Sequence, residues 1–146
     1  MSRPRKKASA AEGKRFGTTT IAPEKSMFDI QGVLTKYDAQ ASQWTVMPDA
    51  YTLRFRVNGR NYLMRIPRLD DDPQETRRLF RVVFWYLDTM LAAMDSGLFT
   101  PERVFLAFLE VAPDVTLSAV LEDPERIGAI RVALGGGQLA LEAGDR

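Results

Sequence analysis

An Asn-Gly pair between two runs of alternating apolar residues constrains the fold of this chain more than any other feature. The stretch YTLRFRVNGRNYLMRIPRL covers residues 51–69, with Asn58 and Gly59 at its centre. Asn-Gly is the preferred pair at the two central positions of a type I′ turn, which joins antiparallel strands directly. The stretch therefore predicts a β-hairpin in which Val57 faces Arg60.

The register of this turn predicts which side chains share each face of the hairpin. Successive side chains point to opposite faces of a strand, and directly opposed residues share a face. One face is then almost wholly apolar, because Phe55 faces Tyr62 and Leu53 faces Met64. The opposite face holds Thr52, Arg54, Arg56, Asn61, Leu63 and Arg65.

A helix is expected before the hairpin. It should begin near Ser26, with Asp29 three residues later in the manner of a capping box, and end before the turn at residues 37–39. Ile30 and Leu34 lie on its apolar stripe. The following SQWTVM is a short β-prone run, which predicts a first strand beside the hairpin.

A longer helix is expected after the hairpin. DDDPQE places Asp72 at the N-cap, Pro73 at the first helical position and Glu75 where it would complete a capping box. The helix should run from Gln74 to Asp95 and stop at the next Ser-Gly pair. It is apolar nearly all round, so we expect the hairpin to cover one side and later helices or a second subunit the other.

Shorter helices are expected toward the C-terminus. TPER at Thr100 and DPER at Asp123 predict helices near 101–110 and 124–134, with a shorter one near 115–122. The fold class is therefore α+β. A three-stranded antiparallel β-meander should be packed on one face by the long helix, with an N-terminal helix and short C-terminal helices.

One folded domain is expected between two ends without regular structure. The chain has 146 residues, of which 45% are hydrophobic, and this suits a single domain. Residues 1–20 are small, polar and basic, and we interpret them as a disordered basic arm. Residues 21–134 should form the α+β domain and residues 135–146 a flexible tail.

The absence of cysteine and histidine excludes several kinds of site. Cysteine is required for disulfide bonds and thiolate metal sites. Histidine is required for the Ser-His-Asp triad and is the commonest general base. We therefore expect a protein that is not an enzyme and needs no cofactor.

Neither a secretory signal nor a membrane helix is expected. The basic N-terminal residues precede no apolar run of about 7–15 residues, as a signal peptide requires. The most apolar segment, Leu79–Met94, is shorter than the roughly 20 residues of a membrane helix and contains Arg81 and Asp88. The sequence favours a cytoplasmic protein that makes no membrane contact.

Positive charge gathers in two parts of the chain, although the net charge is only +1. One part is the N-terminal arm and the other is the polar face of the hairpin, whereas the C-terminal third is acidic. Such asymmetry is typical of proteins with an anionic partner. The candidate nucleic-acid-binding residues are Arg3, Arg5, Lys6, Lys7, Lys14, Arg15, Arg54, Arg56 and Arg65.

Both basic parts have a structural alternative. Exposed arginines keep a one-sided sheet soluble without any partner, and a basic arm also increases solubility. Guanidinium groups also form forked hydrogen bonds to phosphate, which is the functional interpretation. No aromatic residue joins the arginines in this register, so a base-stacking platform would have to come from Trp44, which is more typical of a core residue.

The acidic cluster DDDPQE also has two interpretations. Adjacent carboxylates can hold Mg²⁺ for phosphoryl transfer, which would make the protein a nuclease. Helix capping and compensation of the helix dipole already account for Asp70, Asp71, Asp72 and Glu75. We favour the structural interpretation.

A helix led by PEKS, a hairpin that reads FRVNGR and the run LDTMLAAMDSGLFTPERVFLAFL follow one another in this order. In these motifs the chain resembles a family of small uncharacterised phage and prophage proteins of bacteria. The resemblance covers about residues 23–121. The matching positions are Phe55, Arg56, Gly59, Arg60, Leu91, Ala93, Ser96, Gly97, Thr100, Glu102, Phe105, Leu106 and Ala107. The short acidic DDDP connector departs from a longer basic one in the family, and the C-terminal end also differs.

The resemblance implies a phage or mobile-element origin but no mechanism. Together with the charge pattern, it favours a non-enzymatic accessory protein that contacts nucleic acid through the arm and the arginine-bearing sheet face. The alternative is a protein-binding adaptor or inhibitor of a host or phage complex, which would act through an apolar or acidic helical surface. A homo-oligomer is compatible with both.

Overall fold

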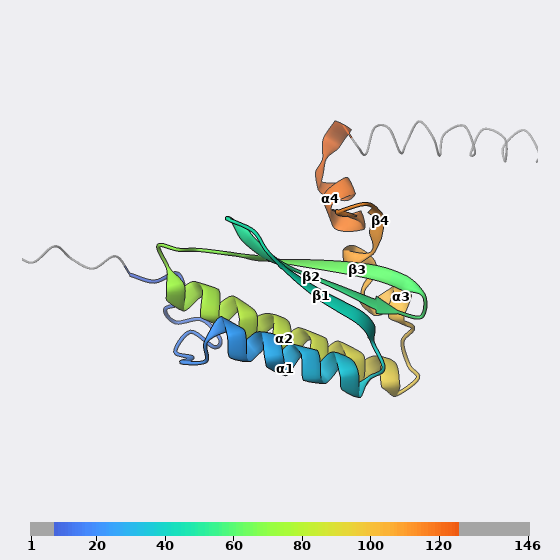
Figure 1. Ribbon diagram of the computed structural model, residues 1–146, viewed down its shortest axis with the longest axis horizontal. Helices are drawn as coiled ribbons and strands as arrows, with labels where there is room; N and C mark the ends of the chain where they lie inside the picture. Colours follow the sequence, from blue (N-terminus) through green and yellow to red (C-terminus); the bar gives the residue numbers. More distant parts are fainter. Residues whose placement is uncertain (1–7, 126–146) are drawn as a thin grey trace, which may run out of the picture.

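A three-stranded antiparallel sheet and two long helices form two layers in the computed structural model, which describes residues 8–125 (Figure 1). The sheet has the order β1-β2-β3, and a smaller β4-β5 pair follows later in the chain. The elements are α1 (Pro23–Lys36), β1 (Gln40–Val46), β2 (Ala50–Val57), β3 (Arg60–Pro67), α2 (Pro73–Asp95), α3 (Pro101–Val104), the 3₁₀ turn η1 (Leu106–Phe108), β4 (Glu110–Ala112), β5 (Val115–Thr116) and α4 (Leu117–Glu122). The α+β prediction is confirmed.

The β2-β3 hairpin has the register that the sequence predicts. Val57 pairs with Arg60 and Phe55 with Tyr62, and the pairing continues without a bulge to the far end of both strands. Asn58 and Gly59 have φ angles of 52° and 78°, as a type I′ turn requires. All of the polar-face residues therefore lie on the side of the sheet away from the core.

Both long helices cover the apolar face of the sheet. Phe80 of α2 is fully buried, and its ring lies 4.9 Å from that of Tyr51 and 5.9 Å from that of Trp44. Trp44 is therefore a core residue and does not join the arginines. The core cluster comprises Ile30, Val33, Leu34, Leu53, Phe55, Val57, Tyr62, Met64, Ile66, Phe80, Leu87, Leu91 and Phe105.

The predicted start of α1 is wrong by three residues. The helix begins at Pro23, whose fixed φ suits the first helical turn, and Ser26 lies buried inside it. Asp29 makes no capping box. It accepts hydrogen bonds from Lys25 and from Arg81 of α2, and these bonds hold its pKa below the usual value.

The start of α2 is confirmed at Asp72, whose carboxylate accepts a hydrogen bond from the backbone N–H of Glu75 at 3.2 Å. The expected capping box does not form. The backbone N–H of Asp72 donates to Leu69, and the Glu75 carboxylate binds Arg78 at 2.6 Å instead. The helix ends as expected before Gly97, which has a φ of 83°.

The helix predicted near 101–110 is also wrong. Its first turn forms α3, but the chain then passes through η1 into β4, so that Phe105 enters the core and Leu109 bridges to the edge of β3 at Tyr62. Pro113 lacks the N–H that a continuing helix needs, and Asp114 has a positive φ in the β4-β5 turn. The helix predicted near 115–122 is present as α4. Beyond residue 125, the remainder of the 124–134 helix and the 135–146 tail lie outside the described residues.

Residues 8–20, part of the predicted disordered arm at residues 1–20, form turns that pack against α2. Ala11 is fully buried, and the side-chain amide of Gln74 donates to the carbonyls of Gly17 and Thr19. A Cβ on Gly17 would lie 2.1 Å from the Ala11 oxygen, so the segment folds tightly on itself. Arg3, Arg5, Lys6 and Lys7 lie outside the described residues.

Candidate nucleic-acid interface

Arg54 is engaged by the C-terminal part of the chain. Its Nε and Nη2 donate to one carboxylate oxygen of Glu110 at 3.1 and 2.9 Å, and Nη2 also donates to Asp114 at 2.7 Å. The hydrogen bond to Glu110 is the first cause that raises the pKa of Arg54. The Glu110 side chain is only 12% exposed, so the pair is partly shielded from solvent. Arg54 therefore attaches the β4-β5 pair to the sheet and is not an open phosphate site.

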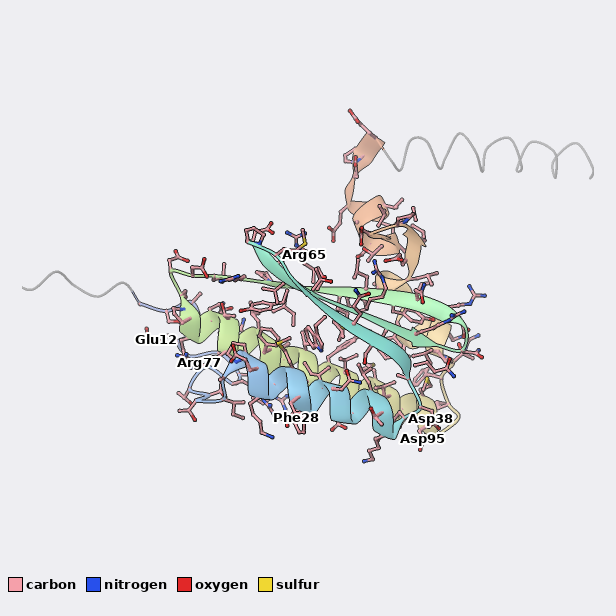
Figure 2. The ribbon with its side chains drawn as sticks, viewed as in Figure 1. Glu12, Phe28, Asp38, Arg65, Arg77 and Asp95 are labelled. Atoms are coloured by element: carbon pink, nitrogen blue, oxygen red, sulfur yellow. The ribbon has the colours of Figure 1, made fainter. Side chains whose placement is uncertain are left out.

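The other two sheet arginines are more open. Arg65 is exposed and pairs with Asp49, also an exposed residue (Figure 2). Arg56 is exposed and donates only a long hydrogen bond, 3.4 Å, to the carbonyl of Gly59. Within residues 8–125 no carboxylate pairs with Arg56. Of the three arginines predicted on this face, Arg56 is the most available to a partner.

The remaining arginines of residues 51–81 are mostly paired as well. Arg60 lies 3.5 Å from Glu102, and Arg68 lies 3.2 Å from Asp70. Arg81 lies 2.9 Å from Asp29 and covers the Phe84 ring. Much of the basic charge that the sequence shows in this region is therefore neutralised within the chain.

Lys14 and Arg15 lie in the ordered N-terminal segment, next to the exposed side of α2. The Arg15 guanidinium carbon stands 4.6 Å from the centre of the Trp85 ring. Trp85 is 39% exposed, a high fraction for a tryptophan. The structure thus places a basic segment beside an exposed indole, a pairing that no local pattern in the sequence indicates.

A depression of about 910 Å³ is lined by residues 8–12 and by the first turn of α2. Arg77 and Glu12 lie at its edge (Figure 2). Residue 8 follows directly on the basic run of Arg3, Arg5, Lys6 and Lys7. The basic run therefore joins the folded domain near Arg77.

Trp85 is the residue that sequence reasoning missed. The sequence predicts only that α2 is apolar nearly all round and covered on two sides, which applies to its neighbour Tyr86. The Tyr86 hydroxyl donates to the carbonyl of Val104 at 3.1 Å. The only local signal for an exposed Trp85 is its position on α2. It lies four residues after Arg81 and one residue beyond the side of the helix that faces the core. Its contact with Arg15 spans 70 positions, and no local pattern predicts it.

Three of the four carboxylates of DDDPQE have a structural role. Asp72 caps α2 and also accepts from the Ser9 hydroxyl at 2.6 Å, whereas Asp70 and Glu75 pair with arginines. Among residues 8–125, no group of three or more acidic side chains is placed to hold a metal ion.

No helix within the described part of the chain is long and apolar enough to cross a membrane. The resemblance to phage and prophage proteins stays a prediction. No family model, curated protein or solved structure matches the chain.

Proposed function

We propose that the protein is a non-enzymatic accessory protein of a phage or mobile element, which contacts single-stranded nucleic acid in the cytoplasm through its basic N-terminal segment and Trp85. The observation that carries the proposal is the contact between Arg15 and the exposed indole of Trp85, with Lys14 adjacent in the chain.

The chemistry of this pair suits single strands. Base–aromatic stacking contributes about 1–3 kcal/mol per base and tolerates any sequence, and guanidinium groups bind phosphate with forked hydrogen bonds. Arg3, Arg5, Lys6 and Lys7 would add phosphate contacts, because they precede the segment directly. Salt-dependent affinity with little sequence preference follows from such a site.

The sheet arginines have a smaller part in this proposal. Arg56 is available for a phosphate, whereas Arg65 would first have to leave Asp49. Arg54 is excluded from the site, because its partner Glu110 would be left as a shielded, unpaired carboxylate.

Changing Lys14 and Arg15 to Glu should weaken binding of a fluorescent oligo-dT or oligo-U strand. Log affinity falls linearly with log salt concentration, and each phosphate contact contributes about 0.7 to the steepness of that fall. Two lost contacts should therefore make the slope shallower by about 1.4. Trp85→Ala should weaken binding about tenfold and leave the slope unchanged, because stacking carries no counterion release. Fluorescence anisotropy at several salt concentrations measures both quantities.

Arg103→Glu is the matched control, because Arg103 is an exposed arginine on α3, far along the chain from the proposed site. The affinity of the Arg103→Glu protein for the oligonucleotide should fall by less than the affinity of the Lys14 and Arg15 variant. Absence of binding by the wild type at low salt would overturn the proposal, since phosphate contacts are strongest there.

The second candidate is a protein-binding adaptor or inhibitor, and one observation favours it. Exposed apolar side chains recur at several places along the chain after α2, which also carries the exposed acids Asp114, paired with Arg54, and Glu122. An apolar surface with acidic neighbours suits a basic partner with apolar side chains. The exposed apolar residues are Leu98, Phe99, Leu106, Val111 and Leu121.

The adaptor candidate predicts a partner that is lost when two of these side chains become polar. Tagged wild type should capture a basic protein from cells carrying the phage or element, and the Leu106→Ser, Leu121→Ser variant should not. Quantitative mass spectrometry of both captures, washed at low and high salt, measures the difference. Recovery of the same proteins with the wild type and with the variant would count against a role of these side chains in binding a partner.

A further inference from the structure

Helix α1 presents an unpartnered face to solvent on the side away from the sheet. Phe28 lies at its centre with 73% of its side chain exposed, and Figure 2 shows it pointing away from the sheet. Full burial of a phenylalanine side chain is worth about 1.5–3 kcal/mol, so this exposure is unfavourable in an isolated chain. The exposed residues of α1 are Glu24, Lys25, Phe28, Gly32, Thr35 and Lys36.

A groove lies beside Phe28, between α1 and α2. Its volume is about 300 Å³, and it is lined mainly by apolar surface from Phe28, Val33 and Phe84. Lys36 and Asp88 also line it. The groove is large enough for an aromatic side chain from another molecule.

Gly32 lies in this groove and has no evident role in the isolated fold. A glycine inside a helix costs about 0.5–1 kcal/mol relative to alanine. A Cβ at Gly32 would meet nothing within 4 Å, so no close packing among the described residues requires a glycine. The missing side chain instead lets another molecule approach the backbone of α1 closely.

We propose that a second copy of this chain covers the face, with the two α1 helices antiparallel across a two-fold axis on the exposed side of α1, at the level of residue 30 along the helix. In that arrangement Phe28 lies opposite the partner's Gly32, because both are two residues from the centre. Two-fold symmetry repeats the contact, so each copy's Phe28 enters the other copy's groove. One arrangement thereby fills both grooves and buries both exposed rings.

Charge complementarity supports the antiparallel direction. Glu24 and Lys36 are both six residues from Ile30, so each Glu24 faces the partner's Lys36. Both side chains are exposed, and neither forms an ion pair with a residue in the described range. A parallel pair would instead set each Glu24 against the same residue of the other copy, which is unfavourable.

The inference does not depend on the proposed function, because it uses α1 and not the N-terminal segment with Trp85. Sedimentation equilibrium of the full chain at about 1–100 μM should show a monomer–dimer equilibrium. Phe28→Ser should raise the dissociation constant at least tenfold. Gly32→Leu should also raise the dissociation constant at least tenfold. It should leave the circular-dichroism spectrum unchanged, because the added side chain points into open space.

A charge exchange tests the direction of the two helices. Glu24→Lys and Lys36→Glu should each weaken the dimer, and the double variant should recover most of the affinity. Leu98→Ser is the matched control, because Leu98 is 72% exposed but lies outside α1, and it should leave the dissociation constant unchanged. A wild type that stays monomeric at 100 μM, about the top of the range, overturns the inference, and so does a double variant weaker than both single ones.

Discussion

Phe105→Ala is expected to lower the free energy of unfolding by about 3–5 kcal/mol, the range for deleting a buried phenylalanine ring. Phe105 is fully buried, and its ring centre lies 5.3 Å from that of Phe55 and 5.6 Å from that of Tyr62. Tyr86 of α2 completes the cluster at 6.5 Å. The side chain thus fixes the chain after α3 to both the hairpin and the long helix.

Urea unfolding followed by circular dichroism measures this loss. Phe99→Ala is the matched control, because Phe99 belongs to the same part of the chain but is exposed, and its effect should stay within about 0.5 kcal/mol. A Phe105→Ala protein as stable as the Phe99→Ala protein would mean that residues 98–122 do not pack on the sheet as described.

The elements that the sequence predicts well are those whose causes are local. The hairpin depends on Asn58 and Gly59, whose preference for positive φ angles fixes the turn and, through the alternation of side chains, the whole register. The start of α2 depends on Asp72 and the proline that follows it. In each case a few neighbouring residues determine the geometry.

The elements that sequence reasoning missed depend on contacts between distant residues. Glu110 lies 56 positions after Arg54, and nothing near either residue shows that they pair. The helix expected at 101–110 stops because Phe105 and Leu109 gain more from contact with β2 and β3 than from another helical turn. Local helix preference is weak compared with such tertiary packing.

The sequence also could not show which basic residues are available to a partner, because that depends on contacts between distant residues. Counting charges along residues 51–81 treats all eight arginines as available, but six of them form ion pairs within residues 8–125. The partners include Asp29, Asp49, Asp70, Glu75, Glu102 and Glu110. The basic N-terminal residues gain an aromatic neighbour only because the segment folds back on α2. The distribution of charge along the sequence predicts an anionic partner, whereas tertiary contacts decide which cations stay available to bind one.

Arg78→Met is expected to lower the free energy of unfolding by about 3 kcal/mol at pH 7, the lower end of the range for breaking a buried ion pair. The Arg78 Nε and Nη2 atoms donate to the two carboxylate oxygens of Glu75 at 2.8 and 2.6 Å. The Glu75 side chain is 7% exposed, so the variant leaves a carboxylate shielded from water without its cation. Arg77→Met is the control, because among residues 8–125 the Arg77 guanidinium donates to the neutral side chain of Gln74 and pairs with no carboxylate.

The pH dependence of this loss distinguishes a lost ion pair from lost packing. Hydrogen bonds from Arg78 hold the pKa of Glu75 below its usual value of 4.5, so the pair stabilises the fold above that pH, and this contribution is lost as the pH falls through the lowered pKa. In the variant, burial without the cation raises the pKa of Glu75, so protonation relieves the penalty. The difference between wild type and variant should therefore shrink between about pH 7 and pH 3.5. Equal differences at both pH values in urea unfolding would show that Arg78 stabilises the helix through the packing of its apolar stem alone.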